Sequence, residues 1–251
     1  MGRVRVGHIW IDSLTFDGAL DSIEALIGRG GAVFTPNVDH VVTADKNEEF
    51  RAAYERADVS VADGQWVVWA AKVLGTPLPA KISGSDLTYP LAKRAGAKGR
   101  SIYLLGGADG AAAAAAKRLT EECGVRIAGI DSPRIDLTRP DPALLERIKE
   151  AKPDLVLVAL GSPKQELWIH RNREALRPAV LLGIGATLDF LAGQIKRAPG
   201  WISRAGLEWL FRLALEPRRL AKRYLVNDPK FAAIVLRTLR EPQVQRITAA
   251  K

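Results

Sequence analysis

Polar side chains that could bind a ligand or move a proton follow the ends of several short apolar runs. In an open parallel sheet, ligands bind beyond the carboxyl ends of the strands, so chemistry is expected in the residues just after each predicted strand. Five strand ends offer hydroxyl, amide, carboxylate or glycine groups, namely Thr35 and Asn37, Asp63-Gly64, Gly106-Gly107, Gln165-Glu166, and Gly185 with Asp189. This pattern predicts one crevice built from several strand ends.

Asp63 has the clearest chemical use in this group, because a carboxylate beside a reacting hydroxyl can accept its proton. Since Asp63 precedes Gly64, it could instead cap the next helix. Gly106-Gly107 could present backbone N–H groups to a phosphate or form an ordinary tight turn. Residues 165–166 could simply open a helix, and Asp189 could cap or pair inside the fold.

Residue patterns typical of other chemistries do not occur. There is no Asp-x-Asp pair, and His8, His40 and His170 lack metal-ligand spacing, so we expect no dedicated metal site. There is no complete G-x-G-x-x-G and no G-x-x-x-x-G-K-[ST], which counts against dinucleotide oxidoreduction and P-loop phosphoryl transfer. A mechanism without metal or cofactor must rely on a carboxylate base and fixed hydrogen-bond donors.

The pattern of apolar residues predicts the strands and helices that hold these side chains. Six runs are continuously apolar or β-branched, as in strands covered on both faces: 31–35, 59–62, 101–105, 125–130, 154–160 and 179–184. Helical spacers such as 111–123 and 141–151 suit crossovers to parallel neighbours. We therefore predict an α/β fold, a Rossmann-like, mostly parallel sheet flanked by helices.

Capping and proline signals place several helix boundaries. Thr15 can cap a helix that ends at Gly30, Pro142 stands at a first-turn position, and Pro153 ends the helix before the next strand. From Pro199 onward we predict no further strands. Prolines there punctuate three expected helices, over 200–215, 217–226 and 229–239.

The formal charge of +9 is concentrated at the C-terminal end. Residues 197–251 contain twelve Lys/Arg against four Asp/Glu, whereas the rest of the chain contains 25 against 24. The same segment carries Trp201, Trp209 and Tyr224, and aromatic and basic residues together favour a membrane interface. We therefore divide the chain into an α/β core, 1–196, and a basic helical appendage, 197–251, that contacts an anionic membrane surface. The alternative is a solvated helical face with a few core-facing aromatics.

Composition also indicates the compartment. A chain of 251 residues with 47% apolar content can bury a substantial core. The single Cys123 rules out a disulfide within the chain and fits a reducing compartment. No run of about 18 uncharged apolar residues and no signal-peptide pattern occurs, so we expect a cytoplasmic protein that lies on a membrane without crossing it.

These motifs resemble the WecG/TagA/CpsF family of bacterial glycosyltransferases, and the resemblance covers nearly the whole chain. The matching pieces are Thr35-Pro-Asn37, Ala62-Asp63-Gly64, Gly84-Ser85-Asp86-Leu87, Leu105-Gly-Gly107, Leu160 to Glu166, Gly185 to Pro199, and Gly206 to Arg219. The resemblance implies a metal-independent, inverting transfer of a sugar from a UDP-sugar to a polyprenyl-diphosphate-linked sugar at the inner membrane face. The implied donor is UDP-N-acetylmannosamine or its uronic acid, and the implied pathways are teichoic acid or surface polysaccharide assembly.

The resemblance also implies residue roles. Asp63 is the candidate general base, while Thr35, Asn37 and Gln165 orient the donor or acceptor sugar. Backbone groups near Gly106, Gly107 and Gly185, with Asp189, would hold the nucleotide, and tail arginines would neutralise a diphosphate. The full set of substrate-binding candidates is Asn37, Gly64, Lys81, Ser85, Asp86, Gly106, Gly107, Gly185, Asp189, Arg197, Arg212 and Arg219.

One position departs from the family pattern, since Lys81 stands where members commonly carry arginine ahead of the G-x-D-L motif. Lysine keeps the charge but loses the bidentate fork.

Two other functions stay open beside the transferase: transfer of another UDP-hexose, and a noncatalytic nucleotide-sugar-binding membrane adaptor. We expect no nucleic-acid partner, because the tail aromatics look helical and amphipathic. The helices expected in the tail could pack against the α/β core of the same chain or against a second subunit of a homo-oligomer. A chain truncated after Ile195 should be more soluble and inactive.

Overall fold

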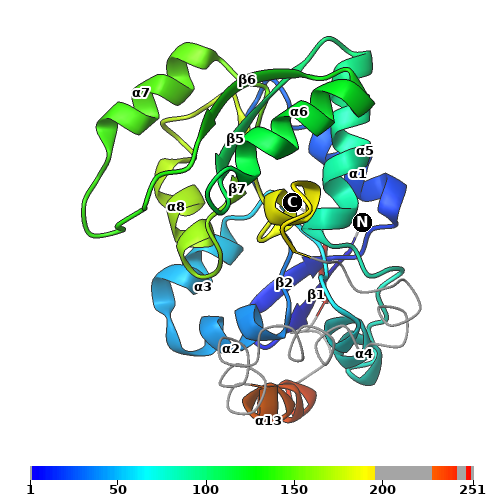
Figure 1. The fold of residues 1–251 in the computed structure, drawn as a ribbon. Helices are drawn as coiled ribbons and strands as arrows, with labels where there is room; N and C mark the ends of the chain where they lie inside the picture. The colour runs from blue at the N-terminus through cyan, green and yellow to red at the C-terminus, as the bar shows by residue number, and fades with distance from the viewer. Residues whose placement is uncertain (1, 196–227, 242–246, 250–251) are drawn as a thin grey trace.

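A six-stranded parallel sheet forms the centre of the molecule (Figure 1). The structure is a computed structural model that describes residues 2–195, 228–241 and 247–249. All six strands predicted from the apolar runs are confirmed, and they lie in the order β4-β3-β8-β7-β5-β6 with every neighbouring pair parallel. Their bounds are β3 Gly31–Phe34, β4 Val59–Ser60, β5 Ser101–Gly106, β6 Arg126–Asp131, β7 Leu155–Ala159 and β8 Val180–Gly183.

Helices cover both faces of this sheet. The two apolar clusters on either side take alternate residues of one strand, so Phe34 packs with one cluster and its neighbour Val33 with the other. One face is covered by α1 Phe16–Glu24, α5 Gly84–Ala97, α6 Ala111–Cys123 and α9 Thr187–Leu191. The other is covered by α2 Val38–Lys46, α3 Glu48–Glu55, α7 Pro142–Ala151 and α8 Lys164–Asn172. Helix α4 Gln65–Val73 belongs to the same apolar cluster and packs against the N-terminal strand β1. The predicted α/β class is therefore confirmed.

The helix boundaries follow local signals in the sequence. The Thr15 hydroxyl accepts a hydrogen bond from the Gly18 amide at 3.1 Å, which confirms the predicted cap of α1. The same helix ends at Glu24 and not at Gly30 as predicted, because the chain continues in turns to a loop where Gly28 and Gly30 both take positive φ. Pro142 opens α7 as expected.

A second, antiparallel sheet joins the two ends of the chain. It consists of β1 Gly2–Val6, β2 Ile9–Asp12 and β9 Ile247–Ala249, in the order β2-β1-β9. The prediction that strands stop at Pro199 is wrong, because β9 completes this sheet by pairing with β1.

The C-terminal helix α13 Asp228–Leu239 confirms the helix predicted over 229–239. Phe231 and Ile234 are buried in the core cluster that also holds the β1–β2 hairpin. The Gly7 amide donates to the Thr238 hydroxyl at 3.2 Å, which fixes the helix to the hairpin turn. The helices predicted over 200–215 and 217–226 lie outside the described residues, and the division at residue 196 stays a prediction. None of the described helices has the length and apolar character needed to span a membrane.

Candidate active site

The exits of β3 and β4 run side by side at the carboxyl edge of the sheet. The Val61 amide donates to the Phe34 carbonyl at 3.0 Å, and the Asp63 amide donates to the Pro36 carbonyl at 2.8 Å. Thr35 is buried between them, at 7% exposure. Because these backbone hydrogen bonds join the two segments, the crevice residues predicted after β3 and after β4 lie next to each other.

Asp63 does not act as the helix cap that the sequence left open. The N-cap position of α4 is Gly64, whose φ is +107°, and the helix begins without a side-chain capping bond. A Cβ at that position would meet no atom within 4 Å, so glycine is required there by the backbone angle alone. Asp63 is half-buried at the mouth of this turn. Capping therefore does not account for it.

Asn37 has a local structural role. Its side-chain Oδ1 accepts hydrogen bonds from the Asp39 amide at 3.0 Å and the His40 amide at 3.4 Å, which makes it the N-cap of α2. Asn37 therefore holds the start of α2, and the sugar-orienting role that the family resemblance implies for it stays a prediction.

Gln165 ties together the ends of β7 and β8. It lies in the first turn of α8 with 4% of its surface exposed. Its Oε1 accepts a hydrogen bond from the Gly185 amide at 2.8 Å, and its Nε2 donates to Glu166 Oε1 at 2.8 Å. A Cβ on Gly183 would lie 2.4 Å from that Nε2, so the glycine leaves room for the amide. These contacts fix the plane of the Gln165 side chain and bring two predicted site residues together.

The sequence interpretation missed a buried network behind this site. The Tyr54 hydroxyl and His40 Nδ1 are 2.8 Å apart, and His40 Nε2 lies 3.9 Å from Glu166 Oε1. All three side chains are buried. The available signal was the position of His40, one helical turn after Asn37 on a helix that opens at a strand end. We interpreted the histidines only as possible metal ligands, so their packing role went unpredicted.

Burial shifts the pKa values of two side chains in the network behind the site. Burial raises the pKa of Glu166 to about 7, although hydrogen bonds from its own backbone amide and from the Gln165 side chain act to lower it. The pKa of Tyr54 is raised well above its ordinary value, first by burial and then by the negative charges of Glu166 and Asp63. Burial therefore favours the neutral forms of both Glu166 and Tyr54 behind the site.

The glycine pair after β5 makes a turn with little spare room. Gly106 has a φ of +100°, and a Cβ there would lie 2.4 Å from the Ala159 carbonyl oxygen. The Gly107 amide donates to that same carbonyl at 2.9 Å, and the next amide, of Ala108, donates to Asp189 Oδ1 at 2.8 Å. Asp189 therefore braces the turn, and a phosphate placed here would face amides that already have protein acceptors.

The G-x-D-L motif opens helix α5. Asp86 closes a capping box with Ser83, and Ser85 Oγ lies 2.9 Å from the Ser83 hydroxyl. Lys81 Nζ is 3.7 Å from Asp86 Oδ2, so this lysine is paired at the helix start. A Cβ on Gly84 would lie 2.9 Å from the Ile184 Cα, which shows how closely α5 approaches the end of β8. The motif thus shapes one wall of the site.

The three predicted tail arginines, Arg197, Arg212 and Arg219, lie outside the described residues. Within the described ranges, no group of three or more His, Cys, Asp or Glu side chains has an arrangement that could hold a metal ion.

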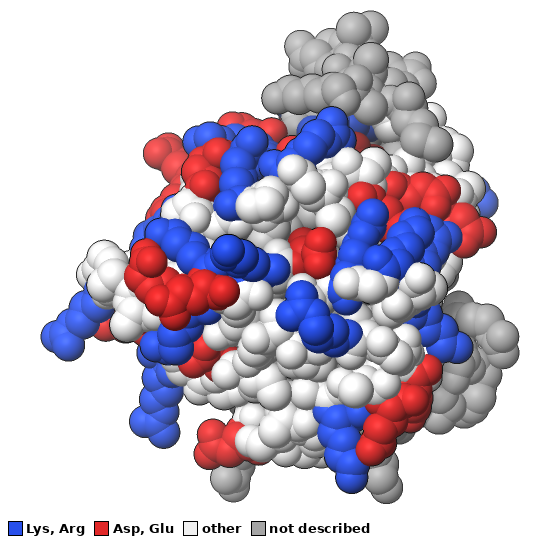
Figure 2. Space-filling view, turned by 90° about the horizontal axis from the view of Figure 1, so that it is seen from above, with Lys and Arg blue, Asp and Glu red and all other residues white. Residues whose placement is uncertain are grey.

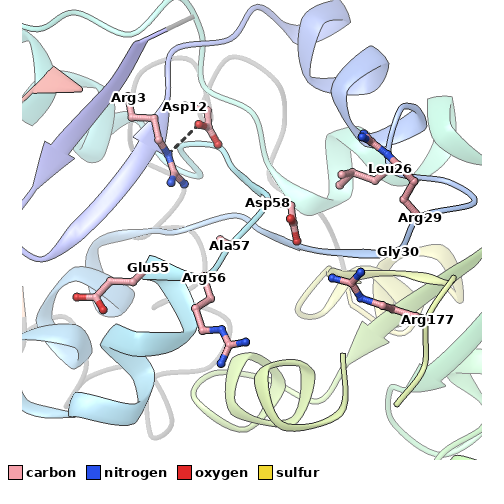
Figure 3. Close-up of a pocket in the computed structure, with 10 residues that line it drawn as sticks. All are labelled: Arg3, Asp12, Leu26, Arg29, Gly30, Glu55, Arg56, Ala57, Asp58 and Arg177. Atoms are coloured by element: carbon pink, nitrogen blue, oxygen red, sulfur yellow. Dashed lines mark ion pairs between the residues drawn. The ribbon is translucent and has the colours of Figure 1, made fainter. Parts of the chain in front are cut away.

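A cavity of about 580 Å³ lies at the opposite edge, where the parallel strands begin (Figure 3). Asp12 is paired with Arg3 at 2.9 Å, and Asp58 with Arg173 at 2.6 Å. Asp58 also accepts a hydrogen bond from the Ala32 amide at 2.8 Å. On the face seen from above, basic and acidic side chains are likewise interspersed (Figure 2). These pairings engage both aspartates that line the cavity. The residues predicted to do chemistry after β3, β4, β7 and β8 lie at the carboxyl edge instead.

Sequence comparisons define the class of enzyme that carries this site. The family model described as "Glycosyl transferase WecG/TagA/CpsF family" matches residues 4–245, so the chain is a glycosyltransferase. It belongs to the WecG/TagA/CpsF family, as its motifs predicted. A curated relative from Bacillus spizizenii (strain ATCC 23059 / NRRL B-14472 / W23) is 33% identical over 210 residues, which cover 83% of this chain and 80% of the relative. That relative is named N-acetylglucosaminyldiphosphoundecaprenol N-acetyl-beta-D-mannosaminyltransferase.

Proposed function

We propose that this enzyme transfers N-acetylmannosamine, or its uronic acid, from UDP to a polyprenyl-diphosphate-linked N-acetylglucosamine. The name of the Bacillus spizizenii relative supports the acceptor and the sugar. The observation that carries the proposal is the position of Asp63, half-buried beside the buried Thr35 at the carboxyl edge of the sheet. Surface polysaccharide or teichoic acid assembly would use the product.

The chemistry is an inverting displacement. An acceptor hydroxyl oxygen attacks the anomeric carbon of the donor sugar and passes its proton to the Asp63 carboxylate. The bond from that carbon to the diphosphate oxygen breaks, and UDP leaves with the bonding electrons. Thr35 and Asn37 would orient the sugars, while the Gln165–Gly185 bridge would hold the ends of β7 and β8 in place.

The departing UDP carries negative charge that must be stabilised. We propose that no metal does this, because the sequence has no Asp-x-Asp pair and no histidine pair at ligand spacing. Arginine and lysine would supply the positive charge instead, with Lys81 at the opening of α5 and Arg197, Arg212 and Arg219 from the tail as candidates. The Gly106-Gly107 turn, braced by Asp189, would place the nucleotide through its shape, since the Gly107 and Ala108 amides already have protein acceptors.

The setting follows from the acceptor. A polyprenyl anchor holds the acceptor at the membrane, so we propose a cytoplasmic enzyme that binds the inner membrane face peripherally and is drawn there partly by the basic tail. A homo-oligomer is compatible with this arrangement.

The test is a transfer assay with the full chain, a polyprenyl-diphosphate-N-acetylglucosamine analogue, a panel of UDP-sugars and EDTA. UDP release and lipid-linked product with UDP-N-acetylmannosamine would support the proposal. Product with a different UDP-hexose alone would change the donor. UDP-sugar binding without product from any donor would favour the noncatalytic adaptor, and activity that requires added divalent metal would contradict the metal-free mechanism.

A further inference from the structure

Five large apolar side chains lie exposed at one end of the molecule. On α4, Trp66, Trp69 and Val73 are 46%, 40% and 63% exposed, and on α13, Leu236 and Leu239 are 59% and 42% exposed. Both helices pack against β1 and lie at the lower end of the view in Figure 1. Large apolar side chains that share one exposed helix face, as on α4, mark a contact site more often than scattered ones do.

The exposure on α4 follows from the spacing of its residues. Val67, Ala70 and Leu74 fill the core, so the opposite face of the helix presents Trp66 and Trp69 one turn apart. The two indole rings pack edge to face, with centroids 4.9 Å apart and planes at 82°. This pairing leaves both rings partly open. Nothing in the packing of α4 on the core requires tryptophan at either position.

The charges in the sequence that carries this face suit an anionic partner. Between Asp63 and Asp86 the sequence contains no Asp or Glu, and its two ionisable residues are Lys72 and Lys81. Lys72 is exposed on α4 between Trp69 and Val73. Tryptophan beside lysine is the combination that binds the boundary between lipid headgroups and acyl chains, where the indole meets both apolar and polar groups.

We propose that the exposed face of α4, formed by Trp66, Trp69, Lys72 and Val73, is a membrane-contact surface that docks the enzyme on an anionic bilayer. Helix α4 begins two residues after Asp63, so docking through this face holds the candidate base close to the bilayer surface. The proposal rests on the proposed function for its purpose, since a lipid-linked acceptor presents its sugar at that surface. It differs from the tail prediction because this surface belongs to the folded core.

The test measures binding of the full chain to vesicles of phosphatidylcholine and phosphatidylglycerol by co-sedimentation. The variant Trp66→Ser/Trp69→Ser should bind about tenfold more weakly than wild type. The matched control is Ile130→Ser, which removes a 42%-exposed apolar side chain from the edge strand β6 and should leave binding unchanged. No nucleotide or acceptor is present, so the outcome is independent of whether the proposed transfer reaction is right. Equal vesicle binding by wild type and the double variant would overturn the proposal.

Two further measurements separate a bilayer from a second copy of the chain. Brominated lipids should quench less tryptophan emission in a milder Trp66→Phe/Trp69→Phe variant than in wild type, because the two indoles that enter the lipid are gone. Sedimentation velocity without vesicles should give the same mass for wild type and the serine variant. If the serine variant instead breaks an oligomer while its vesicle binding is unchanged, the face is an interface between copies and the proposal is wrong.

Discussion

Gln165 Oε1 accepts a hydrogen bond from the Gly185 amide at 2.8 Å, and this bond joins the first turn after β7 to the first residues after β8. The amide nitrogen of the same side chain is held by Glu166, so the side chain has one orientation. The junction between the ends of β7 and β8 is therefore set by a single buried side chain, and changes that move it should impair transfer without unfolding the protein.

The fit between Gly183 and Gln165 gives a prediction that a double-mutant cycle can test. Gly183→Ala places a Cβ 2.4 Å from Gln165 Nε2 and should lower both stability, by about 2 kcal/mol, and transfer activity. In a Gln165→Ala background the Nε2 atom that would clash is absent, so Gly183→Ala should cost little further stability. Urea unfolding of the four proteins measures this coupling. Additive costs would show that the two residues do not interact.

The raised pKa of Glu166 predicts a pH dependence of stability. The folded-state pKa lies at about 7 against an unfolded value of 4.5, so the protonated carboxyl is favoured in the folded state. This contribution is fully present below about pH 4.5 and is lost as the pH rises to about 7, in total about 3 kcal/mol. Glu166→Gln keeps the shape without titrating. Its free energy of unfolding should therefore rise relative to wild type from pH 5 to pH 8, and a constant difference would contradict the assignment.

The turn at Gly106 should tolerate no side chain. Gly106→Ala combines a φ of +100° with a Cβ 2.4 Å from the Ala159 carbonyl, so it should cost about 3 kcal/mol or more. Gly110→Ala is the matched control. Its φ is +76° and its Cβ meets no atom within 4 Å, so backbone strain alone should cost about 1 kcal/mol. Equal costs in urea unfolding would show that the close approach at Gly106 is relieved by a shift of the turn.

The structure changes the expected result of removing the tail. Truncation after Ile195 was expected to give a more soluble protein, but it also removes α13, whose Phe231 and Ile234 are buried in the core, and β9, which pairs with β1. The truncated chain should therefore unfold at a lower urea concentration and expose apolar surface. Dye binding and urea unfolding of the truncated chain check this. Unchanged stability would mean that the hairpin folds without its C-terminal partners.

Continuous apolar runs such as 101–105 and 154–160 were sufficient to predict all six strands of the parallel sheet, because a strand buried on both faces leaves that mark in the sequence. The β1–β2 hairpin was missed although Val4, Val6, Ile9 and Ile11 alternate as a half-buried strand pair does. Its third strand, β9, depends on a pairing across nearly the whole chain that no local pattern reports.

Residue types at the site were easier to predict than their partners. Strand-end positions pointed to Asp63 and Gln165. The Asn37 and Asp86 side chains accept bonds from amides two or three residues away, which are local caps that we did not predict from the sequence. The bond from the Ala108 amide to Asp189 joins residues 81 positions apart, so it depends on which amide comes near after folding. The His40–Glu166 approach joins two helices distant in sequence, so it was not readable from spacing.

The most direct measurement is the turnover of Asp63→Asn with UDP-N-acetylmannosamine and the lipid-linked acceptor. We predict a loss of about 1,000-fold or more in kcat, with UDP-sugar binding and thermal stability close to wild type, because the amide keeps the shape but does not accept the proton. The control Asp17→Asn, at an exposed carboxylate on α1, should be fully active. Turnover by Asp63→Asn within a few fold of wild type would contradict the assignment of Asp63 as the base.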